Sequence, residues 1–284
     1  MARNETEQVR QLQRTLYRTA KQSKAVKFYS VYDKVWRMDV LREAWQQVKE
    51  NRGAPGVDGE TIEGIVSREE EEEMISRLQE QLRAKTYRFQ PVRRVDIPKP
   101  KGGTRPLGIA TVEDRVVQTA MKLVLEPIFE ADFHPCSYGY RPQRDAKMAS
   151  TAIRNDLYQG AWGVVEIDFR SYFTTIPHDK LIILIKQRVV DGSMLRLIKQ
   201  SLTVGIAYEG RWSQRRWESR KGHRSHRSTA TFTLTCWTRC GISEGTQRNW
   251  GPPCTATLMM RFSFAVRAVR MLLRHSRPSR HGWG

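Results

Sequence analysis

The stretch Ile97-Pro-Lys-Pro-Lys-Gly-Gly-Thr-Arg-Pro-Leu-Gly-Ile109 decides how the middle of the chain folds. It continues a run from Val92 to Pro98 in which apolar and polar residues alternate, as in a half-buried strand. Lys101-Gly-Gly-Thr104 is a glycine-rich turn, and Arg105 to Ile109 predicts the return strand. The sequence therefore predicts an antiparallel hairpin with a basic tip.

Helical patterns precede and follow this hairpin. Apolar residues recur at helical spacing after Val35, and Asn51-Arg52-Gly53 then supplies a helix stop. A second amphipathic helix is predicted up to about Lys85. After the hairpin a helix begins near Glu113, and Pro127 is predicted to end it because proline interrupts the hydrogen bonds of a helix interior.

The remaining pattern up to residue 210 predicts an α+β fold. Residues 143–157, 179–190 and 194–202 are typical of helices, and Val164 to Asp168 predicts a short buried strand. The organisation that follows is a basic N-terminal arm over residues 1–34, a helical region over residues 35–90 and a region built around the hairpin and the strand over residues 91–210.

Composition points to a polyanion as partner. The 284 residues hold 49 Lys and Arg against 30 Asp and Glu, a formal net charge of +19, and an excess of this kind favours RNA or DNA. No apolar run approaches the roughly 18 residues of a membrane span, so no membrane association is expected. Four unevenly spaced cysteines do not form a disulfide framework, which favours a reducing, cytoplasmic location.

The charge is concentrated near the end of the chain. Residues 211–284 hold 15 Lys and Arg against 2 Asp and Glu and therefore carry +13 of the +19. Their Arg, Ser, Thr and Trp residues follow neither a helical nor a strand period. We predict a separate, disordered tail over residues 211–284.

Asp168 is the strongest chemical candidate. A carboxylate at the end of a buried strand, followed by a chain reversal, commonly holds a divalent cation such as Mg²⁺. An Asp in this position also caps a following turn, here through Ser171. Position alone leaves both interpretations open.

The hairpin tip and the aromatic pair after Asp168 are weaker candidates. In Lys99-Pro-Lys-Gly-Gly-Thr-Arg105, glycines let backbone N–H groups approach phosphate while Lys and Arg supply charge. An exposed, solvated turn is the simpler alternative. Tyr172 and Phe173 fit either a packed core or the floor of a nucleotide pocket.

Six segments taken together resemble one family, the reverse transcriptase/maturase proteins of group II introns. They follow the family's order and spacing over roughly residues 30–210. The segments are Arg52-Gly-Ala-Pro-Gly-Val-Asp-Gly59, Ile97 to Ile109, Glu113-Asp-Arg-Val-Val-Gln118, Leu125-Glu-Pro-Ile-Phe129, Ser137-Tyr-Gly-Tyr-Arg-Pro142 and Glu166-Ile-Asp-Phe-Arg-Ser-Tyr-Phe173. The resemblance implies the fingers and part of the palm of a right-hand polymerase in residues 91–210.

The resemblance also implies roles around the nucleotide. Asp168 would be the first ligand of the catalytic Mg²⁺, with Mn²⁺ as an alternative ion, and the Phe169 carbonyl would be a second contact. Phe173 would lie under the incoming sugar and discriminate against a 2′-hydroxyl. Lys99 and Arg105 would bind the triphosphate.

Two further segments would contact RNA. The segment Gly53–Gly59 would lie over the template, with Arg52, Gly53 and Gly56 at the contact. The segment Ser137–Pro142 would support the template strand through Tyr138 and Arg141. The implied partners are group II intron RNA, an RNA template with a DNA primer, and a dNTP; a homodimer is a further expectation.

After residue 210 the sequence departs from the family, which there carries a Pro-Gln-Gly loop, a Tyr-Ala-Asp-Asp turn and a helical thumb. A shifted reading frame accounts for this departure. In the shifted frame, each codon consists of the third base of one residue's codon and the first two bases of the next residue's codon. Each pair of neighbouring residues then limits which amino acid this frame encodes. Met259-Met260 forces an Asp, and the three preceding pairs permit Tyr-Ala-Asp. The pairs from Glu218 to Arg227 permit Val-Pro-Gln-Gly-Ser-Pro-Ile-Ser-Pro. We therefore predict a frameshift between about Tyr208 and Arg216, which also explains an early end of the chain.

Three functional outcomes remain open at this point. The first is an RNA-directed DNA polymerase by descent, catalytically incomplete because the other carboxylates are out of frame. The second is a maturase-like fragment that binds RNA without polymerase activity. The third is a degenerate, non-functional product in which the strand before Asp168 is left with an unpaired edge.

Overall fold

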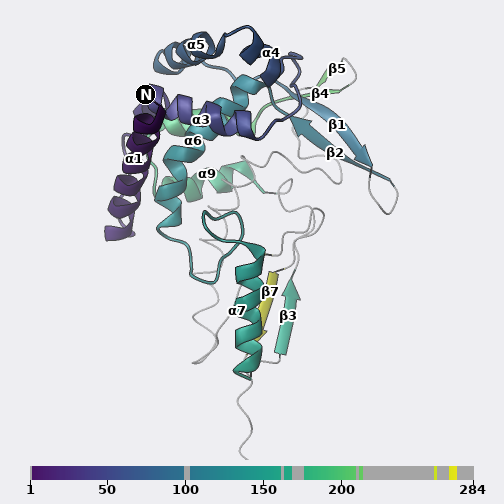
Figure 1. Cartoon of the computed structure of the whole chain (residues 1–284). Helices are drawn as coiled ribbons and strands as arrows, with labels where there is room; N and C mark the ends of the chain where they lie inside the picture. The colour runs from purple at the N-terminus through teal and green to yellow at the C-terminus, as the bar shows by residue number, and fades with distance from the viewer. Residues whose placement is uncertain are drawn as a thin grey trace, which may run out of the picture. The chain divides into compact units, whose positions relative to one another are not determined.

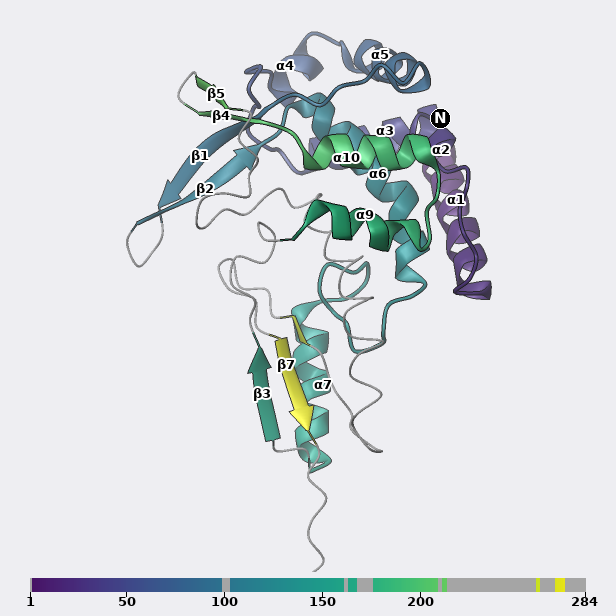
Figure 2. The ribbon, with the colours of Figure 1, turned by 180° about the vertical axis from the view of Figure 1, so that it is seen from behind.

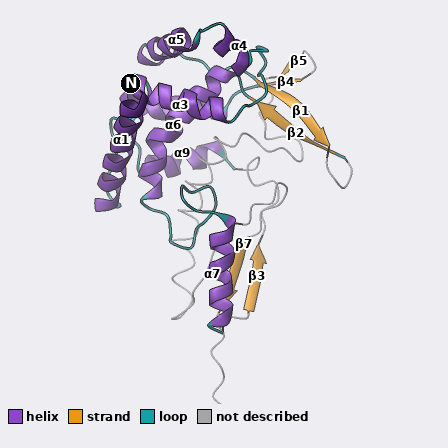
Figure 3. Ribbon diagram, in the orientation of Figure 1, coloured by secondary structure: helices purple, strands orange, loops and turns teal. Residues whose placement is uncertain are grey.

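The computed structural model describes residues 2–98, 103–160, 163–167, 176–208, 211–213, 259–260 and 269–273 (Figure 1). They belong to two compact units, the first formed by Met1–Asp132 with Ser171–Trp237 and the second by Phe133–Arg170 with Thr238–Gly284. Each unit contains its own sheet. Helices and strands together confirm the predicted α+β class (Figure 3).

Three long helices form the core of the first unit. These are α1 (Ala2–Gln22), α3 (Met38–Glu50) and α6 (Val112–Glu130), and each packs against the other two. The other described helices of this unit lie around them and are seen from behind in Figure 2: α2 (Tyr32–Val35), α4 (Ile62–Ser67), α5 (Glu71–Arg83), α9 (His178–Lys186) and α10 (Gly192–Leu202).

Apolar periodicity predicted the inward faces of two of these helices. The helical pattern after Val35 becomes α3, and the pattern before Lys85 becomes α5. The apolar residues that make up these two patterns are buried: Val40, Leu41, Ala44, Trp45 and Val48 on α3, and Met74, Ile75, Leu78 and Leu82 on α5. Period and burial agree here because one face of each helix meets the core and the other meets solvent.

The predicted end of α6 at Pro127 is wrong. The helix continues through Pro127 to Glu130. A proline cannot donate a hydrogen bond to the carbonyl four residues earlier, which here is that of Leu123. The side chain of Gln13 on α1 supplies the missing donor, since its Nε2 lies 3.1 Å from the Leu123 carbonyl oxygen. Packing of α1 against α6 thus makes the interior proline tolerable.

The predicted hairpin is confirmed. Strands β1 (Val92–Pro98) and β2 (Thr104–Ile109) pair antiparallel, from Arg93 opposite Ile109 to Pro98 opposite Thr104. Strand β4 (Ile206–Tyr208) runs parallel to β1, and β5 (Arg211–Ser213) pairs with β4, which gives the order β2-β1-β4-β5. Strand β5 lies within the segment predicted to be a disordered tail.

Arg188 ties three segments of the first unit together: its own, the end of α1 with the chain that follows it, and the chain just after α6. Its side chain is fully buried, and its guanidinium donates to the carbonyls of Ala20, Ser23 and Val26 at the end of α1. Its Nε lies 2.9 Å from an Asp132 carboxylate oxygen just after α6, without hydrogen-bond alignment. The backbone around it also exchanges hydrogen bonds with Phe28, so this segment pairs with the chain after α1.

Asp191 caps two helices at once. One carboxylate oxygen accepts from the backbone N–H groups of Val31 and Tyr32 at the start of α2, at 2.9 and 2.8 Å. The other accepts from Ser193 and Met194 at the start of α10. Burial opposes ionisation, but the four N–H donors outweigh it and lower the pKa of Asp191.

Where the second unit is described, it consists of helix α7 and a small sheet, joined to loop segments (Figure 2). Helix α7 (Ala146–Tyr158) begins at Asp145, whose side chain accepts from the Met148 N–H. Strand β3 (Gly163–Ile167) pairs antiparallel with β7 (Val269–Leu273), which also pairs with β6 (Met259–Met260). Strand β7 covers one edge of β3, and β3 stands at the end of the order β3-β7-β6, so the expectation of an unpaired edge at β3 stays a prediction. The domain boundary at residue 210 stays a prediction.

We expect Arg188→Met to destabilise the first unit strongly. The substitution removes one partner of a buried ion pair and three carbonyl contacts, and such losses cost about 3–5 kcal/mol. Urea unfolding followed by circular dichroism measures the change. Lys186→Met, at an exposed position two residues earlier, is the control and should change stability by less than about 0.5 kcal/mol. Equal stability of the two variants would contradict the role given to Arg188.

Candidate nucleic-acid interface

A loop of residues 51–60 follows α3 and contains three of the predicted RNA-contacting residues. Asn51 caps α3, and Arg52 takes the left-handed conformation with φ of 43°. The predicted helix stop is confirmed, with Arg52 rather than Gly53 as the left-handed residue. Arg52 is exposed.

Two arginines from different elements hold this loop. Arg93 of β1 donates from both Nε and Nη2 to the Pro55 carbonyl, at 3.1 and 2.7 Å. Arg115 of α6 donates from Nη2 to the Ala54 carbonyl at 2.7 Å. Consecutive carbonyls of the loop are thus bound to the hairpin and to the helix that follows it.

The glycines of the loop allow this close approach. A Cβ at Gly56 would lie 2.5 Å from the Thr111 Cα and 2.7 Å from its backbone nitrogen. A Cβ at Gly53 would lie 2.0 Å from Nη1 of Arg115. Thr111 itself caps α6 by accepting from the Asp114 N–H. The loop backbone therefore rests directly on the N-terminus of α6.

Charge accumulates under the loop. Among the described residues neither Arg93 nor Arg115 forms an ion pair with a carboxylate, so their positive charges are not neutralised by a direct partner. Burial lowers the pKa of Arg115, and the nearby Asp58 acts in the opposite direction. The Arg115 guanidinium remains protonated near neutral pH, since an arginine pKa lies far above it. An exposed loop over two such charges is a suitable surface for an anion.

Asp114 anchors the start of α6 to the chain that enters β1. Its carboxylate accepts from the Tyr87 hydroxyl at 2.6 Å and from the Gln90 N–H at 3.0 Å. Burial raises the pKa of Asp114 to about 6, although these hydrogen bonds act in the opposite direction. The carboxyl is thus partly protonated in mildly acidic solution.

The nucleotide-binding residues implied at the hairpin tip are only partly described. Lys99 lies outside the described residues, and Arg105 is described as backbone in β2 without its side chain. On the hairpin itself, Arg94 pairs with Asp96 at 3.1 Å and stacks on the Tyr208 ring at 4.5 Å. The role of the tip stays a prediction.

A second loop, in the other unit, contains Tyr138 and Arg141. The Arg141 guanidinium donates to the carbonyls of His134 and Ser137, at 2.9 and 2.8 Å, and lies 4.9 Å from the centre of the Phe133 ring. Arg144 lies over the Tyr138 ring at 5.2 Å. Arg141 thus binds its own loop in this structure, and a contact of either residue with template stays a prediction.

The residues expected around the metal, Asp168, Phe169 and Phe173, lie outside the described residues. Within the part of the chain that is described, no group of three or more His, Cys, Asp or Glu side chains is placed to hold a metal ion.

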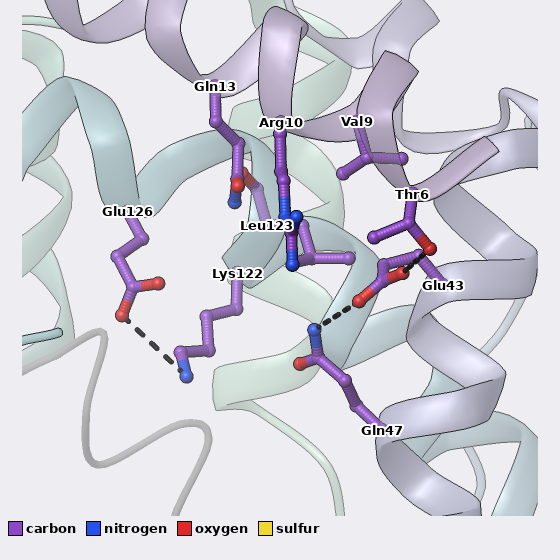
Figure 4. Close-up of a pocket in the computed structure, with 9 residues that line it drawn as sticks. All are labelled: Thr6, Val9, Arg10, Gln13, Glu43, Gln47, Lys122, Leu123 and Glu126. Atoms are coloured by element: carbon purple, nitrogen blue, oxygen red, sulfur yellow. Dashed lines mark hydrogen bonds and ion pairs between the residues drawn. The ribbon is translucent and has the colours of Figure 1, made fainter. Parts of the chain in front are cut away.

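A polar cleft of about 320 Å³ lies between α1, α3 and α6 (Figure 4). Glu43 accepts from Thr6 and from Gln47, each at 3.0 Å, and Lys122 lies 3.6 Å from Glu126. Burial raises the pKa of Glu126, with Lys122 opposing it. The contact of Thr6 with Glu43 joins α1 to α3, and Gln13 of α1, which also lines the cleft, joins α1 to α6 through the Leu123 carbonyl. The cleft therefore reflects helix packing rather than the predicted interface.

Comparison with known proteins decides the family. Residues 97–230 match the family model described as reverse transcriptase (RNA-dependent DNA polymerase). The chain carries a reverse-transcriptase domain. The match begins in the hairpin and extends beyond residue 210. The reverse-transcriptase family uses divalent metal ions and binds a nucleic-acid template and primer.

Relatives of the reverse-transcriptase chain include intron-encoded proteins. It is 34% identical over 204 residues to "Protein YkfC" of Escherichia coli, covering 69% of this chain and 53% of that protein. It is 35% identical over 181 residues to "Group II intron-encoded protein LtrA" of Lactococcus lactis, covering 63% and 29%. It is 32% identical over 176 residues to a protein in the cob intron of Schizosaccharomyces pombe, covering 61% and 21%. The match thus spans about half of the first relative and less of the others.

Among the helices described in this reverse-transcriptase chain, none is both long enough and apolar enough to cross a bilayer. The sequence pattern missed two residues of the interface, Arg93 and Arg115. Arg115 lies in the Glu113–Gln118 segment that resembles the family, and Arg93 is one of two adjacent arginines in the predicted strand. Neither signal reveals that the partner is a loop carbonyl far away in the sequence.

We expect Gly56→Ala to separate the loop from α6. A Cβ at this position meets backbone rather than a movable side chain, and overpacking of this kind costs about 1–3 kcal/mol. Thermal and urea unfolding measure the loss, with the exposed Val57→Ala as control. A Gly56→Ala variant as stable as the control would show that the loop does not rest on Thr111.

We expect the contribution of Asp114 to the free energy of unfolding to fall as the pH rises from about 4 to 7. Because its pKa is raised to about 6 in the fold, the native state binds more protons than the unfolded state in this window, and deprotonation costs on the order of 2–3 kcal/mol. Asp114→Asn removes this titration. Urea unfolding at several pH values measures the free energy of unfolding of the wild type and of Asp114→Asn. The difference between the two should change across this pH window. A difference that stays constant would contradict the raised pKa of Asp114.

Proposed function

We propose that the chain descends from a group II intron reverse transcriptase/maturase and binds RNA through its fingers region, while its polymerase chemistry is incomplete. The observation that carries this proposal is the reverse-transcriptase match over residues 97–230, together with 35% identity to a group II intron-encoded protein. The six ordered segments that resemble the family support it further.

The proposed partners follow from that descent. They are group II intron RNA, whose splicing the ancestral protein assists, and an RNA template with DNA primer and dNTP. Mg²⁺, or Mn²⁺ in its place, is the proposed cofactor, with Asp168 and the Phe169 carbonyl as its contacts. A cytoplasmic location and a homodimer belong to the same proposal.

Two surfaces of the first unit support RNA binding. On α1 the buried positions Val9, Leu16 and Ala20 face the core, and exposed cationic residues occupy other positions of the helix: Arg10, Arg14, Arg18 and Lys21. The loop held by Arg93 and Arg115 is the second surface. Contacts of cationic side chains with phosphates supply affinity that depends on salt rather than on sequence.

The proposed loss of polymerase activity rests on the reading frame. Nucleotidyl transfer by two metal ions requires carboxylates beyond the first one. The printed sequence has Asp168, but it has Met259 and Met260 where the shifted frame reads Asp. Sequencing the gene through codons 205–270 tests the frame directly, and an unshifted, clean frame would contradict it.

Purified protein, a primed RNA template and Mg²⁺ test both halves of the proposal. We expect no primer extension, and we expect RNA binding that weakens with salt and survives Asp168→Ala. Extension by the wild type that Asp168→Ala abolishes would overturn the proposed deficiency. Equal affinity for intron RNA and for unrelated RNA of the same length would overturn specific recognition and leave charge attraction alone.

A further inference from the structure

We infer that Arg93 and Arg115 are positioning residues that hold the Gly53–Gly59 loop ready to contact RNA. This inference rests on the proposed function and extends it, because it assigns a task to two side chains that bind carbonyls of the loop. The two arginines act through the loop backbone.

The geometry explains why two arginines are needed. Ala54 and Pro55 lie between the end of α3 and the tight contact of Gly56 with Thr111. Their carbonyls point to different elements, one to Arg115 on α6 and the other to Arg93 on β1. Each carbonyl belongs to its own peptide group, so fixing both fixes the orientation of the two peptide groups on either side of Pro55. The loop is then held at three points, by Arg93, Arg115 and Thr111, and all three residues lie outside the loop.

The sequence of the loop suits this arrangement. Gly53 has no Cβ, which leaves the space that the Arg115 guanidinium occupies. Pro55 has a fixed φ and restricts the residue before it to extended conformations, so the Ala54 carbonyl is presented with little conformational freedom. The outward residues Arg52, Ala54 and Val57 are exposed and remain available for a ligand.

Holding the loop in advance lowers the cost of binding. A loop that must become ordered on binding loses conformational entropy at that step, whereas a loop that is already ordered does not. The two guanidiniums also carry charge, so an experiment must separate positioning from electrostatic attraction.

Lysine variants achieve that separation. Arg93→Lys and Arg115→Lys keep the positive charge but lose the planar fork that reaches the carbonyls. Arg94→Met is the matched control, because it removes a charge from the neighbouring position of β1, where Arg94 pairs with Asp96 instead of with the loop. Hydrogen exchange of the amides of residues 53–59 reports loop order, and anisotropy of a labelled single-stranded RNA reports affinity.

We expect the two lysine variants to exchange faster at residues 53–59, with α3 amides unchanged, and to bind RNA about 3- to 10-fold more weakly. Arg94→Met should leave loop exchange unchanged. Unchanged loop exchange in the lysine variants would overturn the inference, and so would faster exchange with wild-type affinity. Absence of RNA binding by the wild type would overturn the proposed function itself. The titration of the wild type alone shows this, so failure of the proposed function is distinguished from failure of the inference about the two arginines.

Discussion

The buried guanidinium of Arg188 is the contact on which the first unit depends. It reaches three carbonyls at the end of α1 and the carboxylate of Asp132 after α6. Without it, the core helices α1 and α6 would lose their common attachment to the segment between α9 and α10. A cation buried at this point requires all of these partners, because an unsatisfied charge in the interior is very costly. The packing of the long helices is therefore constrained by one polar centre as well as by apolar burial.

The same chemistry recurs at other arginines. Arg93, Arg115 and Arg141 all donate to backbone carbonyls of loops. A carbonyl satisfies the hydrogen-bond donors of a guanidinium without cancelling its charge, so these residues organise the chain and leave it electropositive. Part of the basic excess thus serves the fold, and it produces a positive field at the loops even where no side chain points outward. The net charge of a nucleic-acid-binding chain is accordingly a poor count of its phosphate contacts.

Local patterns predicted the parts of the fold that depend on local physics. The buried faces of α3 and α5 and the pairing of β1 with β2 follow from apolar period and turn chemistry. The continuation of α6 through Pro127 does not, because it depends on Gln13, more than a hundred residues away. The role of Arg93 and Arg115 is equally hidden, since a side chain's choice of a distant carbonyl leaves no period in the sequence. Of the candidate site, the sequence predicted the loop but not the two arginines that hold it. The role of Asp168 as a metal ligand is implied by the family resemblance.

The double cap at Asp191 has a consequence for how the protein is made. The first unit consists of two stretches of chain separated by residues 133–170, and Asp191 in the later stretch completes the N-terminus of α2 in the earlier one. During synthesis the N-terminal helices emerge from the ribosome long before this carboxylate does. The first unit therefore completes its folding late. Part of the core of its first 132 residues and one helix end stay uncovered until the chain beyond Asp191 has been translated.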